Sequence, residues 1–358
     1  MVDLRSDTAT KPTPAMRDAI ARADVGDEQK REDPTVLELE RRAAELLGQE
    51  EAVFVPTATM ANQIALRIQT EPGDELLAEE NSHLLLAELG GPAVHSGLVT
   101  RGLESVAGRF TPEQVRAAFR EPGSTHYPRT RIVSVENTHN SSGGRVWPLA
   151  EVDALAATGR ELGLRMHLDG ARLLNAAVAS GVPAAEYGRR FDTVTLCLSK
   201  GLGCPLGAVV AGSAELMVRA RRNKHLFGGA MRQAGIVAAA GLYALDNHVE
   251  RLADDHANAH RLAEGLVEAG MPVRLEQVET NFVQLDAGAL GLDADDAVAR
   301  LRAEGVLLSF AARHGVLRAV THLDVSADDV EEAVERIPRA LTGAAPKARL
   351  AADAPTPF

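Results

Sequence analysis

The stretch Val194–Val210, "VTLCLSKGLGCPLGAVV", contains two apolar, β-rich runs that are interrupted by Lys200 beside two glycines. Desolvation disfavours the charged form of a lysine at the end of a buried strand. In one interpretation the ammonium of Lys200 reaches solvent, which is the usual outcome for an isolated Ser-Lys-Gly. In the other interpretation, Lys200 belongs to a site that uses an uncharged amine. The residues that accompany Lys200 decide between these two interpretations.

Short β-rich runs alternate with helical patterns along most of the chain, which is typical of α/β proteins. Further strand-like runs lie at 52–55 and 131–137 and within 165–173, and a long helical pattern covers 232–270. After residue 270 the sequence pattern changes to strands and helices typical of a smaller α+β unit. The chain then ends in an Ala- and Pro-rich segment without periodicity. We predict a large domain with the N-terminal segment over residues 1–245, a small domain over 246–340 and a flexible tail over 341–358.

Composition argues against several classes of protein. The 358 residues are 45% hydrophobic, with a net charge of −12 and a pI near 5.4, so a general nucleic-acid-binding surface is not expected. No run of 18 apolar residues and no charged-then-apolar leader is visible, so neither a membrane span nor a signal peptide is expected. The two cysteines, Cys197 and Cys204, cannot complete a four-ligand zinc site. We predict no metal and a cytoplasmic location.

Polar groups follow other predicted strands, at the edge where ligands of open α/β sheets gather. Thr57 and Thr59 stand at a helix start, where free N–H groups suit a phosphate, although an ordinary helix cap uses the same residues. Asp169 follows apolar Leu168, and a buried aspartate needs a cation or a strong donor such as a pyridinium N–H. Arg172 suits a carboxylate or a phenolic oxygen, with a structural Asp–Arg pair as the alternative.

Asp169 and Lys200 lie 31 residues apart at the ends of two strands, as expected for a cofactor held between neighbouring strands. Pyridoxal 5'-phosphate needs a lysine for a Schiff base, a carboxylate for the ring nitrogen and a phosphate cradle. We therefore predict this cofactor, and an imine explains why a lysine is tolerated at the strand end. His83 is a candidate for stacking on the ring and moving protons, with a core or capping histidine as the alternative.

Several segments, in order, resemble the low-specificity L-threonine aldolases, in the aspartate aminotransferase-like group (fold type I) of pyridoxal-phosphate enzymes. They include "HLDGAR" (167–172), "SKGLG" (199–203) and "MRQAG" (231–235), and together the matching segments span about residues 2–335. The resemblance implies a mostly parallel central sheet flanked by helices, a smaller α+β domain, and a homodimer or homotetramer with active sites at the subunit interface. It also implies cleavage of L-threonine, L-allo-threonine and related β-hydroxy-α-amino acids to glycine and an aldehyde.

The resemblance also implies roles for individual residues. Lys200 corresponds to the Schiff-base lysine and Asp169 to the partner of the pyridine nitrogen. The implied phosphate and cofactor contacts are Thr57, Ala58, Thr59, Arg172 and Arg232, and the resemblance implies that Arg232 is contributed by a neighbouring subunit. The implied binders of the substrate carboxylate are Ser6, Arg172 and Arg318. His83 would stack on the cofactor and His126 would approach the substrate hydroxyl, while Glu88 and residues 136–140 match without an assigned role.

Some residues depart from the family pattern, and these departures bear on which substrate side chains the site prefers. Many relatives carry Tyr-Gly before "EDP", whereas Lys30 and Arg31 stand here, so one wall of the site is predicted to be cationic. Relatives often have glycine where Ala58 and Ala230 stand, which leaves the cofactor site intact.

Three alternatives remain open at the level of sequence. The nearest is another pyridoxal-phosphate reaction on amino acids, such as β-elimination, racemisation or transaldol transfer. An unrelated nucleotide-binding α/β enzyme is disfavoured because the chain lacks a G-x-x-x-x-G-K-[ST] loop. A non-catalytic binding protein is disfavoured by the retained lysine, aspartate and histidines.

Overall fold

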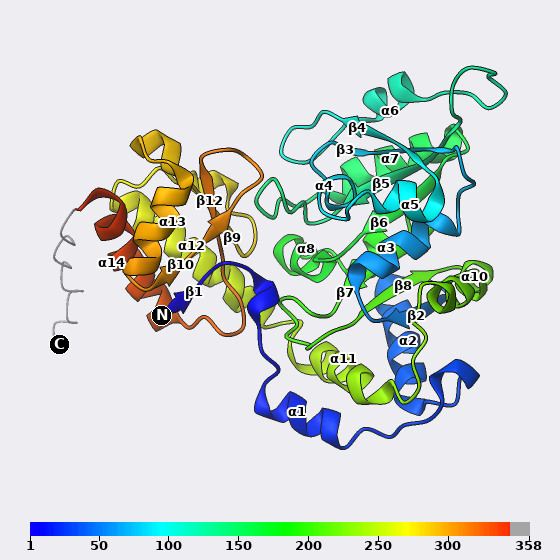
Figure 1. The fold of residues 1–358 in the computed structure, drawn as a ribbon, viewed down its shortest axis with the longest axis horizontal. Coiled ribbons are helices and arrows are strands. Elements are labelled where there is room, and N and C mark those ends of the chain that lie inside the picture. Colours follow the sequence, from blue (N-terminus) through cyan, green and yellow to red (C-terminus); the bar gives the residue numbers. More distant parts are fainter. Residues whose placement is uncertain (344–358) are drawn as a thin grey trace, which may run out of the picture.

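The computed structural model describes residues 1–343, and a seven-stranded sheet forms the centre of its larger part (Figure 1). The strand order is β2-β8-β7-β6-β5-β3-β4. The strands are β2 (Glu51–Val55), β3 (Glu75–Glu79), β4 (Val99–Leu103), β5 (Thr130–Glu136), β6 (Arg165–Asp169), β7 (Thr193–Cys197) and β8 (Ala208–Gly212). Strand β8 is antiparallel to both neighbours, and every other pair in the sheet is parallel. This confirms the predicted α/β class with a mostly parallel sheet.

Helices cover both faces of the sheet because alternate strand residues point to opposite sides. In β2, Ala52 and Phe54 belong to one apolar core, whereas Val53 and Val55 belong to another. The first face is covered by α2 (Pro34–Leu47), α7 (Leu149–Glu161), α8 (Leu173–Ser180), α9 (Ala184–Gly188) and α11 (Gly235–Asn247). The second face is covered by α3 (Ala58–Arg67) and α10 (Ala214–Leu226). The remaining helices of this part are α1 (Pro14–Ala21), α4 (His83–Leu86), α5 (Gly91–Ser96) and α6 (Pro112–Ala118).

The C-terminal part forms a second core around a small antiparallel sheet. Its strand order is β11-β12-β9, with β9 (Phe282–Asp286), β11 (Ser309–Phe310) and β12 (Val316–Val320). The helices of this part are α12 (Leu252–Glu268), α13 (Ala294–Ala303) and α14 (Ala327–Thr342). We propose the domain boundary at the turn between α11 and α12, close to the predicted division after residue 245.

The N-terminal strand packs with this C-terminal part, which the sequence patterns did not predict. Strand β1 (Val2–Asp3) pairs in parallel with β10 (Val306–Leu307), and Val2 and Leu4 are buried in the second core. Figure 1 shows the blue N-terminal strand among the orange and red elements. The chain therefore starts in the small part and crosses to the large sheet, which brings residues 6–10 past its edge.

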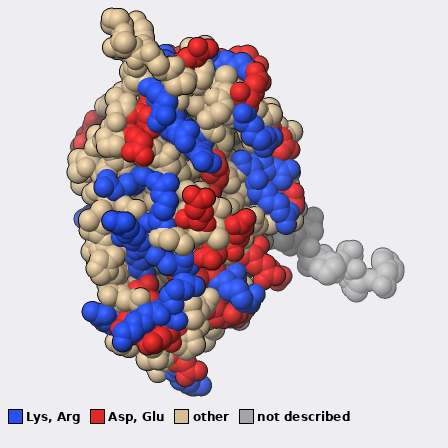
Figure 2. Space-filling model, turned by 90° about the vertical axis from the view of Figure 1, so that its right-hand side faces the viewer, with Lys and Arg blue, Asp and Glu red and all other residues tan. Residues whose placement is uncertain are grey.

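Of the predicted tail, residues 341 and 342 close helix α14, and residues 344–358 lie outside the described residues. Within residues 1–343 no helix combines the length and apolar character needed to cross a membrane. The face drawn in Figure 2 carries Lys and Arg interspersed with Asp and Glu. Several of the exposed charges on the molecule form local pairs, such as Arg41 with Glu38.

Candidate active site

A cavity of about 250 Å³ opens at the carboxyl ends of the central parallel strands, where α/β sheets bind ligands. It is lined by Ser6, Thr8, Ala58, Asn62, His83, Ala87, Glu136, Thr138, Asn140, Asp169, Ala171, Arg172, Lys200 and Arg318. Seven of these residues were singled out from the sequence: Ser6, Ala58, His83, Asp169, Arg172, Lys200 and Arg318. These seven residues come from six separate stretches of the chain and meet in one place.

Lys200 lies three residues beyond β7, on a turn that closes through a hydrogen bond from the Gly203 N–H to the Lys200 carbonyl at 2.8 Å. The Thr10 hydroxyl donates to the same carbonyl at 2.9 Å, which ties the N-terminal segment to this turn. The Lys200 side chain is half-buried, and its amine makes no hydrogen bond or ion pair with any residue in the described range 1–343. The amine is thus available at the cavity.

Asp169 ends β6 and is buried, with donors on both carboxylate oxygens. The Asn62 amide donates to Oδ2 at 2.8 Å and the Ala171 N–H donates to Oδ1 at 3.1 Å. Asn62 lies on α3, and its Oδ1 is 3.2 Å from Nε2 of His167. Burial lowers the pKa of His167 to about 4, so this imidazole is neutral and supports Asn62 as a hydrogen-bond donor.

His83, at the start of α4, is held by a buried carboxylate. Its Nδ1 lies 2.8 Å from Oε1 of Glu88, whose side chain is fully buried. Glu88 also accepts hydrogen bonds from Asn62 at 2.9 Å and from Gln63 at 2.6 Å. The hydrogen bond to Glu88 raises the pKa of His83, with a further contribution from Asp169, against the opposing effect of burial. Glu88, which the resemblance left without an assigned role, therefore binds the ring of His83.

The donor atoms of His83, Glu88 and Asp169 lie within 4.8 Å of one another, a separation that a metal ion could bridge. Asn62, however, already donates to both carboxylates, so hydrogen bonds within the protein satisfy this cluster.

Two arginines from distant elements converge at the other end of the cavity. Arg172 caps α8, and Arg318 comes from β12 of the small sheet. Their Nη1 atoms both donate to Oδ1 of Asn140, at 3.3 Å and 3.1 Å. Both guanidinium groups also lie over the ring of Phe282, at 4.9 Å and 5.6 Å from its centroid. Such a pair of cations suits a carboxylate ligand.

Asp7 is the partner of Arg172 that sequence reasoning missed. It binds the guanidinium through both oxygens, at 2.6 Å and 2.7 Å. Burial by itself would raise the pKa of Asp7, but the ion pair with Arg172 outweighs it and lowers the pKa to about 2. The "SDT" stretch at 6–8 could have indicated a buried carboxylate only if its distant partner had been known.

The N-terminus of α3 borders the cavity through Ala58. Thr57 is the N-cap, and its hydroxyl accepts from the Met60 N–H at 3.2 Å. The N–H groups of Ala58 and Thr59 have no partner within residues 1–343. Thr57 and Thr59 are themselves exposed and do not line the cavity. Two free donors at a helix N-terminus favour an anion here.

Lys30 and Arg31, which were predicted to make one wall of the site cationic, do not line this cavity, and Arg31 lines another pocket instead. Two further residues with predicted roles do not reach it either. His126 lies on an exposed loop, where its Nδ1 is 3.0 Å from the Thr125 hydroxyl. Arg232 is exposed over 64% of its side chain and lies 3.5 Å from Asp27. Neither residue lines the cavity of its own chain.

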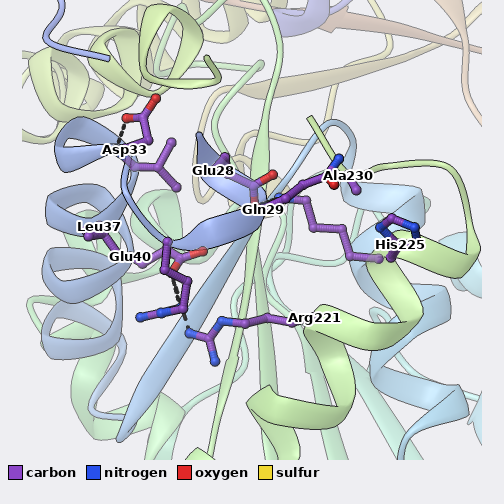
Figure 3. A pocket seen from close by; sticks show the side chains of 11 residues that line it. Glu28, Gln29, Asp33, Leu37, Glu40, Arg221, His225 and Ala230 are labelled. Atoms are coloured by element: carbon purple, nitrogen blue, oxygen red, sulfur yellow. Dashed lines mark hydrogen bonds and ion pairs between the residues drawn. The ribbon is translucent and has the colours of Figure 1, made fainter. Parts of the chain in front are cut away.

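A second pocket, of about 150 Å³, lies where α10 meets the segment before α2 (Figure 3). Lys224 is buried in its wall and forms an ion pair of 2.5 Å with Glu28. Glu28 also accepts from the Met231 N–H at 3.1 Å and donates its own N–H to the Arg232 carbonyl at 3.0 Å. The backbone of Arg232 is therefore anchored while its side chain projects outward.

Comparison with known proteins agrees with this geometry. The family model described as beta-eliminating lyase matches residues 3–288. The low specificity L-threonine aldolase of Escherichia coli (strain K12) is 41% identical over 335 residues, covering 93% of this chain and 97% of that protein. A probable low-specificity L-threonine aldolase of Arabidopsis thaliana is 40% identical over 336 residues, covering 92% of this chain and 94% of that protein.

Solved structures show the same fold at lower identity. A threonine aldolase of Leishmania major superposes with a TM-score of 0.82 at 20% identity, over 96% of this chain and 100% of that chain. An aspartate aminotransferase of Thermus thermophilus superposes with a TM-score of 0.71 at 17% identity, over 95% of this chain and 92% of that chain. The fold is thus the predicted one, and the matched length and identity show that the chain belongs to the beta-eliminating lyase family, among the low-specificity L-threonine aldolases.

Proposed function

We propose that this protein is a pyridoxal 5'-phosphate-dependent carbon–carbon lyase. Its substrates are L-threonine, L-allo-threonine and related β-hydroxy-α-amino acids, and its products are glycine and an aldehyde. One observation carries the proposal: an amine without an ion pair, Lys200, shares a cavity with the buried Asp169 carboxylate and with two convergent arginines. The names of the curated relatives support the choice of substrate.

The residues present fit the cofactor. Asp169 is buried and oriented by Asn62, so it would hold a protonated ring nitrogen. The free N–H groups of Ala58 and Thr59 would take the phosphate, together with Thr57. Lys200 would attach the cofactor through its free amine. When bound, pyridoxal phosphate would accept the electron pair released from the substrate Cα as the Cα–Cβ bond breaks.

The remaining residues bind and orient the substrate. Arg172 and Arg318 would bind the α-carboxylate at the point where their Nη1 atoms converge, close to Ser6. Anchoring the carboxylate fixes the orientation of the Cα–Cβ bond, which contributes to rate by removing rotational freedom before reaction.

His83 is the base that would take the proton of the β-hydroxyl. Its Nδ1 faces Glu88, which leaves Nε2 for the substrate, and Glu88 raises the pKa of the ring, which makes it a stronger base. The role of His126 stays a prediction from the sequence, because its loop does not line the cavity.

We also propose a homodimer or homotetramer in which Arg232 completes the phosphate site of a neighbouring subunit. The support is that its backbone is anchored by Glu28 while its side chain is exposed and away from its own cavity. A cytoplasmic location stays a prediction, and two buried free cysteines are compatible with a reducing compartment.

The decisive experiment incubates the purified holoenzyme with L-threonine and identifies the products. We expect acetaldehyde and glycine in equal amounts. Lys200→Ala should lose the visible absorption of the lysine-bound cofactor and about a thousandfold or more of the turnover. Lys11→Ala, at an exposed lysine, should retain both.

The second candidate is β-elimination, which the description of the matching family model favours. Elimination from L-threonine would release ammonia and a 2-oxo acid and would produce no aldehyde. Detection of those products in place of acetaldehyde would overturn the aldolase proposal and leave the cofactor assignment standing.

A further inference from the structure

Asp7 is a carboxylate with no exposed surface, placed in a short helical turn, η1 (Asp7–Ala9), next to the cavity. Its neighbours Ser6 and Thr8 line the cavity, whereas Asp7 does not. Both of its oxygens bind Arg172, with Oδ2 2.6 Å from Nε and Oδ1 2.7 Å from Nη2. Asn281 approaches Oδ2 at 3.5 Å.

This bidentate pair determines which edge of Arg172 is free. A guanidinium presents five N–H donors in a rigid plane, and Asp7 occupies the edge formed by Nε and Nη2. The two hydrogens of Nη1 and the second hydrogen of Nη2 remain for other partners, and Nη1 donates to Oδ1 of Asn140. Arg318 is restrained in a similar way, because Ser309 accepts from its Nε at 3.2 Å and its Nη1 reaches the same Asn140 oxygen.

Asp7 also balances the charge of this end of the cavity. Burial and the neighbouring Arg172 lower the pKa of Arg318, and Asp7 opposes that effect. The two guanidinium groups and one carboxylate leave a single net positive charge. One substrate carboxylate neutralises that charge, whereas two uncompensated buried cations would repel each other.

We propose that Asp7 is a positioning residue for substrate binding that acts through Arg172. It holds the guanidinium so that the α-carboxylate of an amino acid receives one hydrogen bond from Nη1 of Arg172 and one from Nη1 of Arg318. The inference rests on the proposed function, because it takes the ligand of the two arginines to be the carboxylate of an amino acid.

The test measures calorimetric binding of glycine and of glycinamide, which lacks the carboxylate, to holoenzyme carrying Asp7→Asn. Glycine should bind about ten- to a hundredfold more weakly, while glycinamide affinity changes by less than about threefold, because one charge-assisted contact is lost. The matched control is Asp3→Asn. Asp3 binds Arg5 with the same bidentate geometry, at 2.8 Å and 2.6 Å, on the same segment. Neither residue lines the cavity, so Asp3→Asn should leave the affinities for glycine and glycinamide unchanged.

Equal weakening of both ligands, or unchanged glycine affinity, would overturn the proposal, as would a wild-type protein that binds glycine no better than glycinamide. Should Asp7→Asn not fold, the double variant Asp7→Asn/Arg172→Gln removes both charges together and should bind glycine as weakly as Arg172→Gln alone. A further tenfold loss in the double variant would show that Asp7 acts by another route. Because binding needs no turnover, a protein that cleaves no β-hydroxy amino acid would refute the proposed function without affecting this comparison.

Discussion

At the residue scale, two buried carboxylates hold the charged groups of the site in place. Glu88 binds Nδ1 of His83, and Asp7 binds Arg172. A buried carboxylate is stable only with such partners, so each pair is specific as well as strong. The chemistry of His83 therefore depends on a residue that does not line the cavity.

Glu88→Gln should lower the pKa of His83, because it replaces the carboxylate that raises that pKa by a neutral amide of similar shape. His83 acts as a base only when it is deprotonated, so kcat/KM rises with pH through its pKa. The acidic limb of the pH profile should therefore move to lower pH. The measurement combines this profile with an NMR titration of the His83 ring.

Glu79→Gln is the control for that shift. Glu79 lies 3.0 Å from Nε2 of His139, and neither residue lines the cavity. This variant should leave the acidic limb where it is. An unmoved limb in Glu88→Gln would remove His83 from the role of base.

At the scale of elements, the turn that leads into α2 contains an unusual residue. Arg31 follows η2 (Glu28–Lys30) and has a φ of 58°, in the left-handed region that favours glycine. Its side chain lies 3.3 Å from Glu40 at the second pocket. Glycine, which we expect in many relatives at this position, would adopt this backbone without strain.

Arg31→Gly should be more stable than Arg31→Ala by about 1 kcal/mol, because a left-handed backbone is strained for any residue with a Cβ. Both variants lose the ion pair with Glu40, so their difference isolates the backbone. Denaturant unfolding of the two variants measures it. An alanine variant as stable as the glycine variant would show that the turn relaxes to another conformation.

At the scale of the whole molecule, the cavity is assembled from both parts of the chain. The N-terminal segment starts in the small core through β1 and β10, and then carries Ser6 and Asp7 to the large sheet. Arg318 arrives from the small sheet. Arg232 is exposed and does not line the cavity of its own chain, which is why we assign it to a neighbouring subunit.

Mixing Lys200→Ala chains with Arg232→Ala chains should restore roughly a quarter of wild-type activity if pairing in a dimer is random. Half of the dimers would be mixed, and each mixed dimer would contain one complete site. The assay follows aldehyde release after exchange, with differently tagged chains to demonstrate that mixed dimers form. Demonstrated exchange with activity no higher than in the separate variants would contradict the assignment of Arg232.

The sequence by itself determined the class of fold and the central pair of the site. Strand and helix periodicities are local, so the runs around Lys200 and Asp169 predicted β6, β7 and β8. Because parallel strands end at the same edge of a sheet, the aspartate and the lysine could be placed together from spacing alone. Arg172 was also proposed from its residue type, and the resemblance added Ser6 and Arg318; all three line the cavity.

Only the tertiary structure decided which groups hold the site residues in place and which predicted residues lie outside the cavity. Asp7 meets Arg172 across 165 positions, and β1 meets β10 from the two ends of the chain. Glu88 lies between α4 and α5, and it contacts both His83 and Asn62 because α5 packs against α3. Such contacts arise from packing between distant elements, and no local spacing encodes them, so the exposure of His126 and Arg232 was equally invisible in the sequence.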